Sequence, residues 1–317
     1  MKKNMLSVII ASRVDEYLQK TIDDLLAKAA EEIEVIVVLD GYWPDPMVKN
    51  DPRVKVLHHG QVHAHRGMRA GINTAIDVAS GEYLMKIDEH CMVDESFDKK
   101  LKADCEDNWC VIPRRFRLEP DDWALIEDGR PPVDYMYLAY PYERPFDRTC
   151  GLHGAEWKQR YHERKDVLID DTMSWQGSCW FIKRKYWDEL FPDGLDEEHY
   201  GTFTQEAQEI GNKVWLTGGR LVVNKKTWYA HFHKGRRGKG YGFSRNQYRI
   251  HEADKEKGRL YCIEYWLNTK EFKYDFEWLL NKFWPVPTWP EDWKTRLPVD
   301  AEKDWSKDPA INPTEWL

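Results

Sequence analysis

The sequence predicts an α/β fold in which a mostly parallel sheet carries helices on both faces. Three observations support this class. Short continuous apolar runs predict buried strands, longer segments place apolar residues at helical spacing, and the two kinds of segment alternate between Met1 and His90. Strands that are apolar along their whole length are typical of parallel sheets covered on both faces.

The N-terminal segment predicts a strand followed by a helix. Residues 6–12 (LSVIIAS) form a continuous apolar run. Residues 15–32 follow, with Leu18, Ile22 and Leu25 at the spacing that aligns side chains along one helix face. Because the apolar run is short and leads into charged residues, we interpret it as the first strand of the sheet and not as a signal peptide.

Three further strands and one helix follow. EVIVVLDG (residues 34–41) predicts a second buried strand, and RVKVLHH (residues 53–59) predicts a third. A helix is predicted over residues 67–81, with Gly81 as its C-cap. EYLMKIDEH (residues 82–90) predicts the fourth strand.

The remainder of the chain is less regular. Residues 113–170 are rich in Pro, Arg and Asp, and we interpret them as a long excursion over the active face. Strands and helices resume in residues 178–190 and 213–233. The segment from about Ile250 carries seven of the 16 tryptophans and many prolines, which predicts an ordered appendage on the main domain and not a second globular domain.

Composition excludes several classes of protein. The 317-residue chain has a net charge of −8, which argues against coating nucleic acid by bulk electrostatics. No apolar stretch approaches the ~20 residues that cross a bilayer, so no membrane insertion is expected. The six cysteines form no CxxC pair, which favours reduced thiols. Reduced thiols in turn favour a cytoplasmic location, which would be the host cytoplasm for a viral protein. The 16 Trp and 16 Tyr suit aromatic platforms for sugars or bases, or an ordinary core.

Polar residues end two of the predicted strands. Asp40 follows the second strand, and Asp88, Glu89 and His90 end the fourth. The carboxyl ends of parallel strands are where α/β sheets bind ligands. Asp88 and His90 alternate, so on an extended strand both side chains point to one side and could chelate an ion of Mn²⁺ or Zn²⁺ character.

A third ligand is available further along the chain. His231 and His233 in WYAHFHKG share one face of a predicted short strand. On spacing alone, a pair of hydrogen-bonded histidines near the surface is an equal alternative. HHGQVHAHRG, with four more histidines, lacks an accompanying carboxylate or cysteine, and we interpret it as a polar loop (His58, His59, His63, His65).

These segments together carry a resemblance to a known family. SVIIASRVDEYLQKTIDDLL, EVIVVLDG and ASGEYLMKIDEHCMVDESF resemble the GT-A glycosyltransferases of the broad family-2-like group. The Asp-x-His motif is similar to that of the polypeptide N-acetylgalactosaminyltransferases, as are GTFTQEAQEIGNKVWLTGG and YAHFHKG. The resemblance covers roughly residues 5–235. It implies a GT-A catalytic domain over residues 1–249, with a donor half of about 1–95 and an acceptor half of about 96–249, and a C-terminal extension over 250–317.

The resemblance also implies roles for individual residues. Asp88, His90 and His231 would hold Mn²⁺, or Mg²⁺, against the diphosphate of a nucleotide-sugar, with a UDP-sugar as the expected donor. Glu206 matches the acidic residue near the acceptor, and Gly177 matches a small position beneath the donor sugar. Further contacts to the sugar or acceptor are expected from Trp175 and Gln205. The nucleotide would be bound by Ser12, Arg13, Asp40, Arg66, Arg69 and Asn73.

A basic segment follows the third metal ligand. HKGRRGKGYGFSR combines glycines with positive charge, which predicts a lid that closes on the diphosphate (His233, Lys234, Arg236, Tyr241). The same basic and aromatic residues would also suit a protein that tracks a phosphate backbone and stacks on bases. A solvated basic loop is the third interpretation.

The sequence therefore predicts a metal-dependent glycosyltransferase. Its acceptor would be either a glycan hydroxyl or a hydroxymethylated base in DNA, the latter a DNA modification of the virus type. A metal-dependent hydrolase of a phosphate or diphosphate ester, and a non-enzymatic carbohydrate-binding protein, are the alternatives. The sugar, the stereochemical outcome and the oligomeric state stay open.

Overall fold

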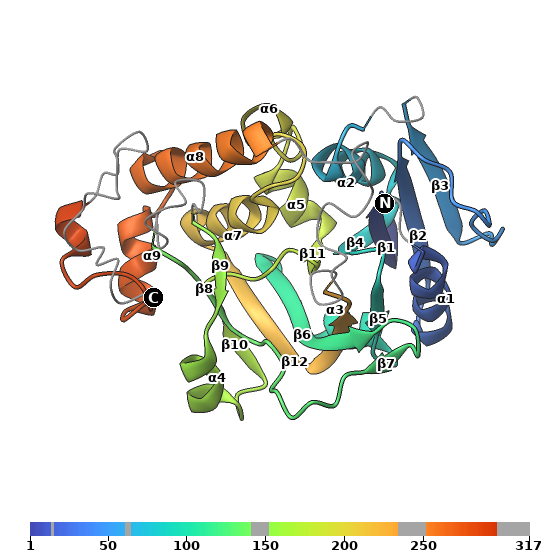
Figure 1. Ribbon diagram of the computed structural model, residues 1–317, viewed down its shortest axis with the longest axis horizontal. Coiled ribbons are helices and arrows are strands. Elements are labelled where there is room, and N and C mark those ends of the chain that lie inside the picture. The colour runs from blue at the N-terminus through green and yellow to red at the C-terminus, as the bar shows by residue number, and fades with distance from the viewer. Residues whose placement is uncertain (14–15, 61–64, 141–151, 234–251, 297–317) are drawn as a thin grey trace.

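The computed structural model describes residues 1–13, 16–60, 65–140, 152–233 and 252–296. Its centre is a ten-stranded sheet with the strand order β10-β12-β6-β11-β4-β1-β2-β3, to which β5 is added beside β12 and β7 beside β6 (Figure 1). The strands of this sheet are β1 (Lys2–Ser12), β2 (Ile33–Asp40), β3 (Val54–His59), β4 (Gly81–Ile87), β5 (Cys91–Val93), β6 (Trp109–Glu119), β7 (Ala124–Leu125), β10 (Ile169–Asp171), β11 (Cys179–Lys183) and β12 (Arg220–His231).

The strand directions confirm a mostly parallel sheet. β1 pairs in parallel with β2 and β4, β2 with β3, and β6 with β12. β11 interrupts this pattern because it runs antiparallel to both β4 and β6. A separate two-stranded sheet joins β8 (Met136–Leu138) to β9 (Gly154–Glu156).

Helices cover both faces of the sheet, as predicted (Figure 1). The helices are α1 (Leu18–Lys28), α2 (Met68–Val78), α3 (Phe97–Ala103), α4 (Lys158–Arg164), α5 (Arg184–Leu190), α6 (Glu197–Tyr200), α7 (Glu206–Thr217), α8 (Glu252–Asn268), α9 (Phe276–Phe283) and the 3₁₀ turn η2 (Trp293–Arg296). Successive residues of β4 show the alternation: Leu84 belongs to the hydrophobic cluster that includes residues of α2, α5 and α7, whereas Met85 belongs to the cluster that includes residues of α1 and α3.

Gly81 does not cap a helix, so this prediction was wrong. Helix α2 ends at Val78, and Ala79 is already extended. Gly81 instead begins β4, where a Cβ atom would lie 2.6 Å from the carbonyl oxygen of Met5 and 2.8 Å from the amide nitrogen of Ser7. The glycine is therefore explained by the close approach of the β1 and β4 backbones.

The predicted excursion over residues 113–170 begins too early. Residues 113–119 belong to β6, which lies inside the sheet between β11 and β12. Pro113 lacks the amide hydrogen that a central strand normally donates, and its partner Asn224 borders an irregularity in the β12 register. Local interruption of the ladder lets the proline remain within the strand.

The C-terminal segment is more helical than the sequence suggested. α8 and α9 occupy much of residues 252–283, and both lie against α7 (Figure 1). Trp266 and Phe283 are buried in the same hydrophobic cluster as Trp215 of α7. The proposed boundary near residue 249 stays a prediction.

Two further observations concern the cysteines and the length and hydrophobicity of the helices. Cys91, Cys105, Cys110, Cys179 and Cys262 are buried free thiols. Among the described residues, no helix combines the length and hydrophobicity needed to cross a bilayer.

Candidate active site

A cavity of about 480 Å³ opens at the carboxyl ends of β1, β2 and β4 and at the start of α7. This is the edge of an α/β sheet where ligands bind. Many of the residues singled out in the sequence line it, namely Ser12, Arg13, Asp40, Asp88, His90, Trp175, Gly177, Gln205, Glu206 and His231.

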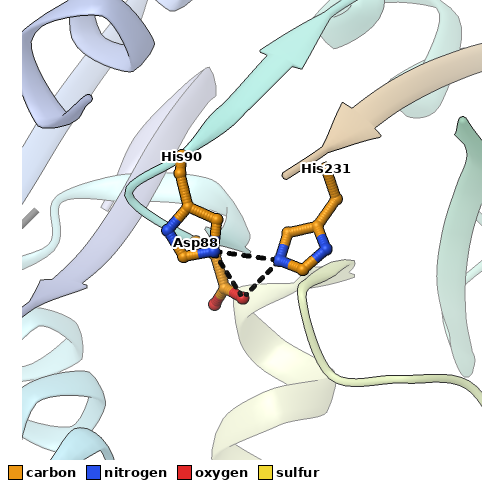
Figure 2. Close-up of side chains that lie close together, drawn as sticks. All are labelled: Asp88, His90 and His231. Atoms are coloured by element: carbon orange, nitrogen blue, oxygen red, sulfur yellow. Dashed lines mark hydrogen bonds and ion pairs between the residues drawn. The ribbon is translucent and has the colours of Figure 1, made fainter. Parts of the chain in front are cut away.

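Asp88, His90 and His231 form one compact cluster in this cavity. One ligand atom from each residue lies within 4.8 Å of the others. The Nε2 atoms of His90 and His231 are 3.0 Å apart, and Asp88 Oδ2 is 3.2 Å from His231 Nε2 and 4.0 Å from His90 Nε2. Figure 2 shows the three side chains converging, with His231 at the end of β12 and with Asp88 and His90 in the connection that follows β4.

The cluster is assembled by a turn and a strand ladder, not by alternation along one strand as predicted. β4 ends at Ile87, and residues 88–90 lie in the turn that leads into β5. Cys91 of β5 is the antiparallel partner of His231, and Phe232 N–H donates to the carbonyl of His90 at 3.1 Å. This ladder holds His90 beside His231 although the two residues are far apart in sequence.

Charge is distributed unevenly within the cluster. Burial alone raises the pKa of Asp88, but the positive charge of Lys86 and the contact with His231 outweigh it, so the pKa lies well below its usual range. Burial lowers the pKa of His231 to about 3. Asp88 is thus a carboxylate and His231 a neutral imidazole at neutral pH, the forms in which both side chains bind divalent ions.

Lys86 is a site residue that the sequence interpretation did not single out. Its side chain is almost fully buried, and Nζ lies 2.6 Å from Asp88 Oδ1, 2.8 Å from the Gly177 carbonyl and 3.4 Å from Glu206 Oε2. Although burial lowers its pKa, Asp88 and Glu206 raise the pKa above the usual lysine range. A lysine in the apolar strand LMKI, two residues before Asp88, was the available signal.

Glu206 begins α7 and points into the cavity. Its Oε1 accepts a hydrogen bond from Trp180 Nε1 at 2.7 Å, while Oε2 faces Lys86. Burial raises the pKa of Glu206, although Lys86 and Trp180 lower it in part. Trp180 itself is fully buried and stacks on Trp187 with ring centroids 4.8 Å apart, so it is a core residue that orients Glu206.

The predicted sugar-side residues surround Glu206. Gly177 has a φ of +91°, and an added Cβ would lie 3.6 Å from Glu206 Oε2. Backbone conformation, more than lack of room, therefore favours glycine there. Trp175 and Gln205 both line the cavity, and the buried indole N–H of Trp175 has no hydrogen-bond partner among the described residues.

The predicted nucleotide-side residues divide into two groups. Ser12 and Arg13 line the cavity, where the Ser12 hydroxyl and the Arg13 N–H both donate to the carboxylate of Glu89. Asp40 also lines it, and its carboxylate accepts hydrogen bonds from the backbone N–H groups of Arg66 and Gly67 at 2.8 and 2.9 Å. Asp40 therefore fixes the start of α2 at the cavity wall.

Arg66, Arg69 and Asn73 do not line this cavity. Arg69 is fully buried, forms an ion pair with Glu209 and donates to the carbonyl of Thr204, so its guanidinium cannot reach a nucleotide in this arrangement. Asn73 exchanges hydrogen bonds with the backbone of Leu195. The side chain of Arg66 is 56% exposed.

The remaining predicted residues lie elsewhere. His233 is exposed, follows the end of β12 and lines a neighbouring cavity instead of joining the cluster. Lys234, Arg236 and Tyr241 of the predicted lid lie outside the described residues, as does His63. The other loop histidines bond separately, to the Tyr42 carbonyl, the Thr74 hydroxyl and the Asp40 carbonyl (His58, His59, His65).

The sheet and the position of its cavity define a GT-A fold, the α/β architecture of many nucleotide-sugar glycosyltransferases. Residues 7–191 match the family model described as glycosyl transferase family 2. The chain belongs to this family. Family membership favours the transferase interpretation over the hydrolase and the carbohydrate-binding protein.

Individual relatives are distant. The uncharacterized glycosyltransferase EpsJ of Bacillus subtilis (strain 168) is 30% identical over 112 residues, which is 33% of this chain and 31% of EpsJ. The crystal structure of GalNAc-T7 with UDP, GalNAc and Mn²⁺ is similar with a TM-score of 0.60 and 18% identity, covering 83% of this chain. A structure of S. aureus TarS residues 1–349 gives a TM-score of 0.44 and 16% identity, covering 71% of this chain and 60% of TarS.

The present chain spans about a third of EpsJ and 48% of the GalNAc-T7 chain.

Proposed function

We propose that this protein is a divalent-metal-dependent glycosyltransferase that moves a sugar from a UDP-sugar to an acceptor hydroxyl. The observation that carries the proposal is the convergence of Asp88, His90 and His231 within 4.8 Å at the cavity edge. One carboxylate oxygen and two imidazole nitrogens form a donor set that suits Mn²⁺, with Mg²⁺ as the alternative. The Mn²⁺ and UDP in the GalNAc-T7 structure support the same assignment.

A bound ion would neutralise negative charge on the diphosphate as the bond between the sugar and the phosphate oxygen breaks. The chain itself supplies the geometry. Ser12, Arg13 and Asp40 line the nucleotide side of the cavity, whereas Gly177 and Gln205 line the side proposed for the sugar. A diphosphate across the cluster would place the sugar carbon that reacts toward Glu206.

Glu206 is proposed to contact the reacting groups. In transfer, the acceptor oxygen forms a bond to the sugar carbon, the electron pair of the broken bond leaves with the diphosphate, and the acceptor hydroxyl loses its proton. A carboxylate whose pKa is raised by burial is a better proton acceptor than an exposed one. This role as a base applies if the reaction inverts the configuration of the sugar carbon. If the reaction retains that configuration, the same carboxylate would orient the sugar or acceptor.

The acceptor hydroxyl belongs to a glycan or to a hydroxymethylated base in DNA. The basic stretch that favours DNA lies outside the described residues. Retention on hydroxymethylated duplex DNA that falls steeply with salt, and is weakened by Arg236→Gln with Arg237→Gln, would support the DNA acceptor. Absence of such retention on DNA would favour a glycan acceptor.

The test is nucleotide release from UDP-, GDP-, CDP- and dTDP-sugars, measured with Mn²⁺ or with chelator. We expect release from one donor, UDP-sugar, that requires the metal and is abolished in Asp88→Ala. Asp94→Ala, which removes a carboxylate outside the cluster, is the matched control. Release that persists with chelator, or in Asp88→Ala, would contradict the metal assignment.

A further inference from the structure

A second cavity of about 460 Å³ adjoins the first one. The two share a wall made of His231 and Phe232, and neither Arg115 nor Arg117 lines the first cavity. β6 supplies both arginines at alternating positions, so they project on one face of the strand. In the parallel pairing of β6 with β12, Arg117 is the partner of His231 and Arg115 is the partner of Tyr229.

Arg115 and Arg117 are partly buried guanidinium groups with no carboxylate within 4 Å among the described residues. Arg115 donates to the carboxamide oxygen of Gln176, and Arg117 Nη1 donates to the carbonyl of Pro131 at 2.9 Å. By contrast, Arg114 on the other face of β6 makes two hydrogen bonds to Asp134, at 2.8 and 2.7 Å. Each guanidinium has five N–H donors, so Arg115 and Arg117 keep several donors for another partner.

Other charged groups line the cavity as well. Arg130, already paired with Asp128, adds positive charge, while Glu119 and Glu156 add negative charge. Three arginines and two glutamates therefore line the cavity. Burial and the nearby Arg130 lower the pKa of Arg117.

We propose that this second cavity is an acceptor subsite in which Arg115 and Arg117 bind a phosphate group of the acceptor. This inference rests on the proposed function of the first cavity. A phosphate offers several oxygens in a tetrahedral arrangement and can engage two guanidinium groups at once, whereas one carboxylate matches a single guanidinium fork. The acceptor phosphate would lie across the His231 wall from the diphosphate of the donor, which leaves its hydroxyl near the shared edge of the two cavities.

The experiment measures binding of small phosphates while the donor cavity is filled. Wild-type protein saturated with UDP and Mg²⁺ is titrated with inorganic phosphate, methyl phosphate, dimethyl phosphate and, for comparison, acetate. We expect saturable phosphate binding that is weakened about tenfold in Arg115→Gln and in Arg117→Gln, since each loses a charge-assisted contact. Arg53→Gln, an exposed arginine beside Asp51 at the other end of the sheet, is the matched control and should bind phosphate as the wild type does.

The phosphate esters distinguish two sources of the same chemistry. Preference for methyl phosphate indicates a terminal phosphate on the acceptor, and preference for dimethyl phosphate indicates a phosphodiester backbone. Arg117→Lys keeps the charge but not the planar fork, so it should lie between the wild type and Arg117→Gln. Thermal unfolding of each variant verifies that it is folded.

Several results would contradict the proposed acceptor subsite. These are no phosphate binding to the UDP-loaded wild type, equal binding by both glutamine variants, or acetate binding as tight as phosphate binding. An equal loss of UDP and phosphate affinity in the variants would place the arginines on the donor. UDP titration without phosphate tests the proposed function separately, because failure to bind UDP with phosphate binding intact would refute the donor site and leave an anion site.

Discussion

Lys86 neutralises two carboxylates of the site. Its ammonium lies between the carboxylates of Asp88 and Glu206 in a buried position. Removal of one partner from a buried ion pair leaves an uncompensated charge and typically costs about 3–5 kcal/mol. The buried charges of the cavity therefore depend on one another.

We expect Lys86→Met to lower the free energy of unfolding by about 3–5 kcal/mol at pH 7, because the carboxylates lose their buried counter-ion. Urea denaturation of the metal-free protein measures this. Lys183→Met in β11 is the matched control, since its partner Asp107 has a side chain that is 96% exposed, and its effect should be much smaller. Equal effects of the two substitutions would show that Lys86 has no special role in the charge balance.

Glu206→Gln tests the second carboxylate. We expect turnover to fall by about 10²–10⁴, the usual range for loss of a positioned acid or base. Mn²⁺ affinity should change little, because Glu206 lies outside the Asp88, His90 and His231 cluster. Steady-state kinetics and Mn²⁺ titration are measured on the same preparation, with the exposed Glu198→Gln as control. Turnover close to that of the wild type would remove Glu206 from the reaction.

Sequence reasoning identified ten of the 26 residues that line the cavity, but for partly different reasons. The cluster was predicted from alternation, whereas a turn and the pairing of β5 with β12 create it. Arg69 and Asn73 were assigned to the nucleotide, and instead they bond to Glu209 and Leu195. Local sequence cannot show which distant element will satisfy a buried polar side chain.

Glu34 of β2 connects this strand to β1, to the residue before β4 and to β3. Its carboxylate accepts hydrogen bonds from the Ser7 hydroxyl at 2.6 Å and from the Ser80 N–H at 2.7 Å, and it pairs with Lys55 at 2.6 Å. Burial raises its pKa, but these contacts prevail and lower the pKa to about 2. Since the folded pKa lies below the unfolded value, Glu34 stabilises the fold above the unfolded pKa, and this stabilisation is lost as the pH falls toward 2.

We expect Glu34→Gln to cost about 3 kcal/mol of unfolding free energy at pH 7, by the conversion of pKa shifts into stability. The difference from the wild type should shrink by more than half by pH 3, because Glu34 takes up its proton at a higher pH in the unfolded chain than in the folded protein. Urea denaturation of both proteins at several pH values between 3 and 7 measures this difference in unfolding free energy. A difference that stays constant with pH would mean that packing, not charge, explains the substitution.

The sequence predicted the N-terminal elements better than the later ones. Strands β1, β2 and β4 are short, continuous apolar runs, the pattern typical of buried strands. Their bounds differ from the prediction by a few residues. β6 was partly missed because it contains Pro113 and several arginines, which normally argue against a central strand. The α8 helix was missed because its polar and apolar residues show little periodicity.

The C-terminal helices α8 and α9 and the segment that follows them complete the main hydrophobic core. Trp266 donates to the hydroxyl of Tyr200, Trp289 donates to the carbonyl of Leu138, and Phe283 packs on Trp215 with ring centroids 5.4 Å apart. These contacts connect the last described segment to three separate parts of the catalytic fold. Their loss would expose a large apolar surface on α7 and its neighbours.

A chain that ends at residue 249 should therefore lose cooperative unfolding and aggregate, whereas one that ends at residue 296 keeps every contact described above. Thermal unfolding followed by circular dichroism, with light scattering, measures both. Cooperative unfolding of the shorter chain would show that residues 1–249 form an independent domain and that α8 and α9 are dispensable for folding.

The ladder between β5 and β12 also sets an order of events during synthesis. Asp88 and His90 leave the ribosome long before His231, which closes the cluster from the end of the last strand of the sheet. Nascent chains therefore present an incomplete ligand set for most of their translation. Full metal capture by the proposed site must await closure of the sheet, so the ion would load a finished fold and could not guide its earlier stages.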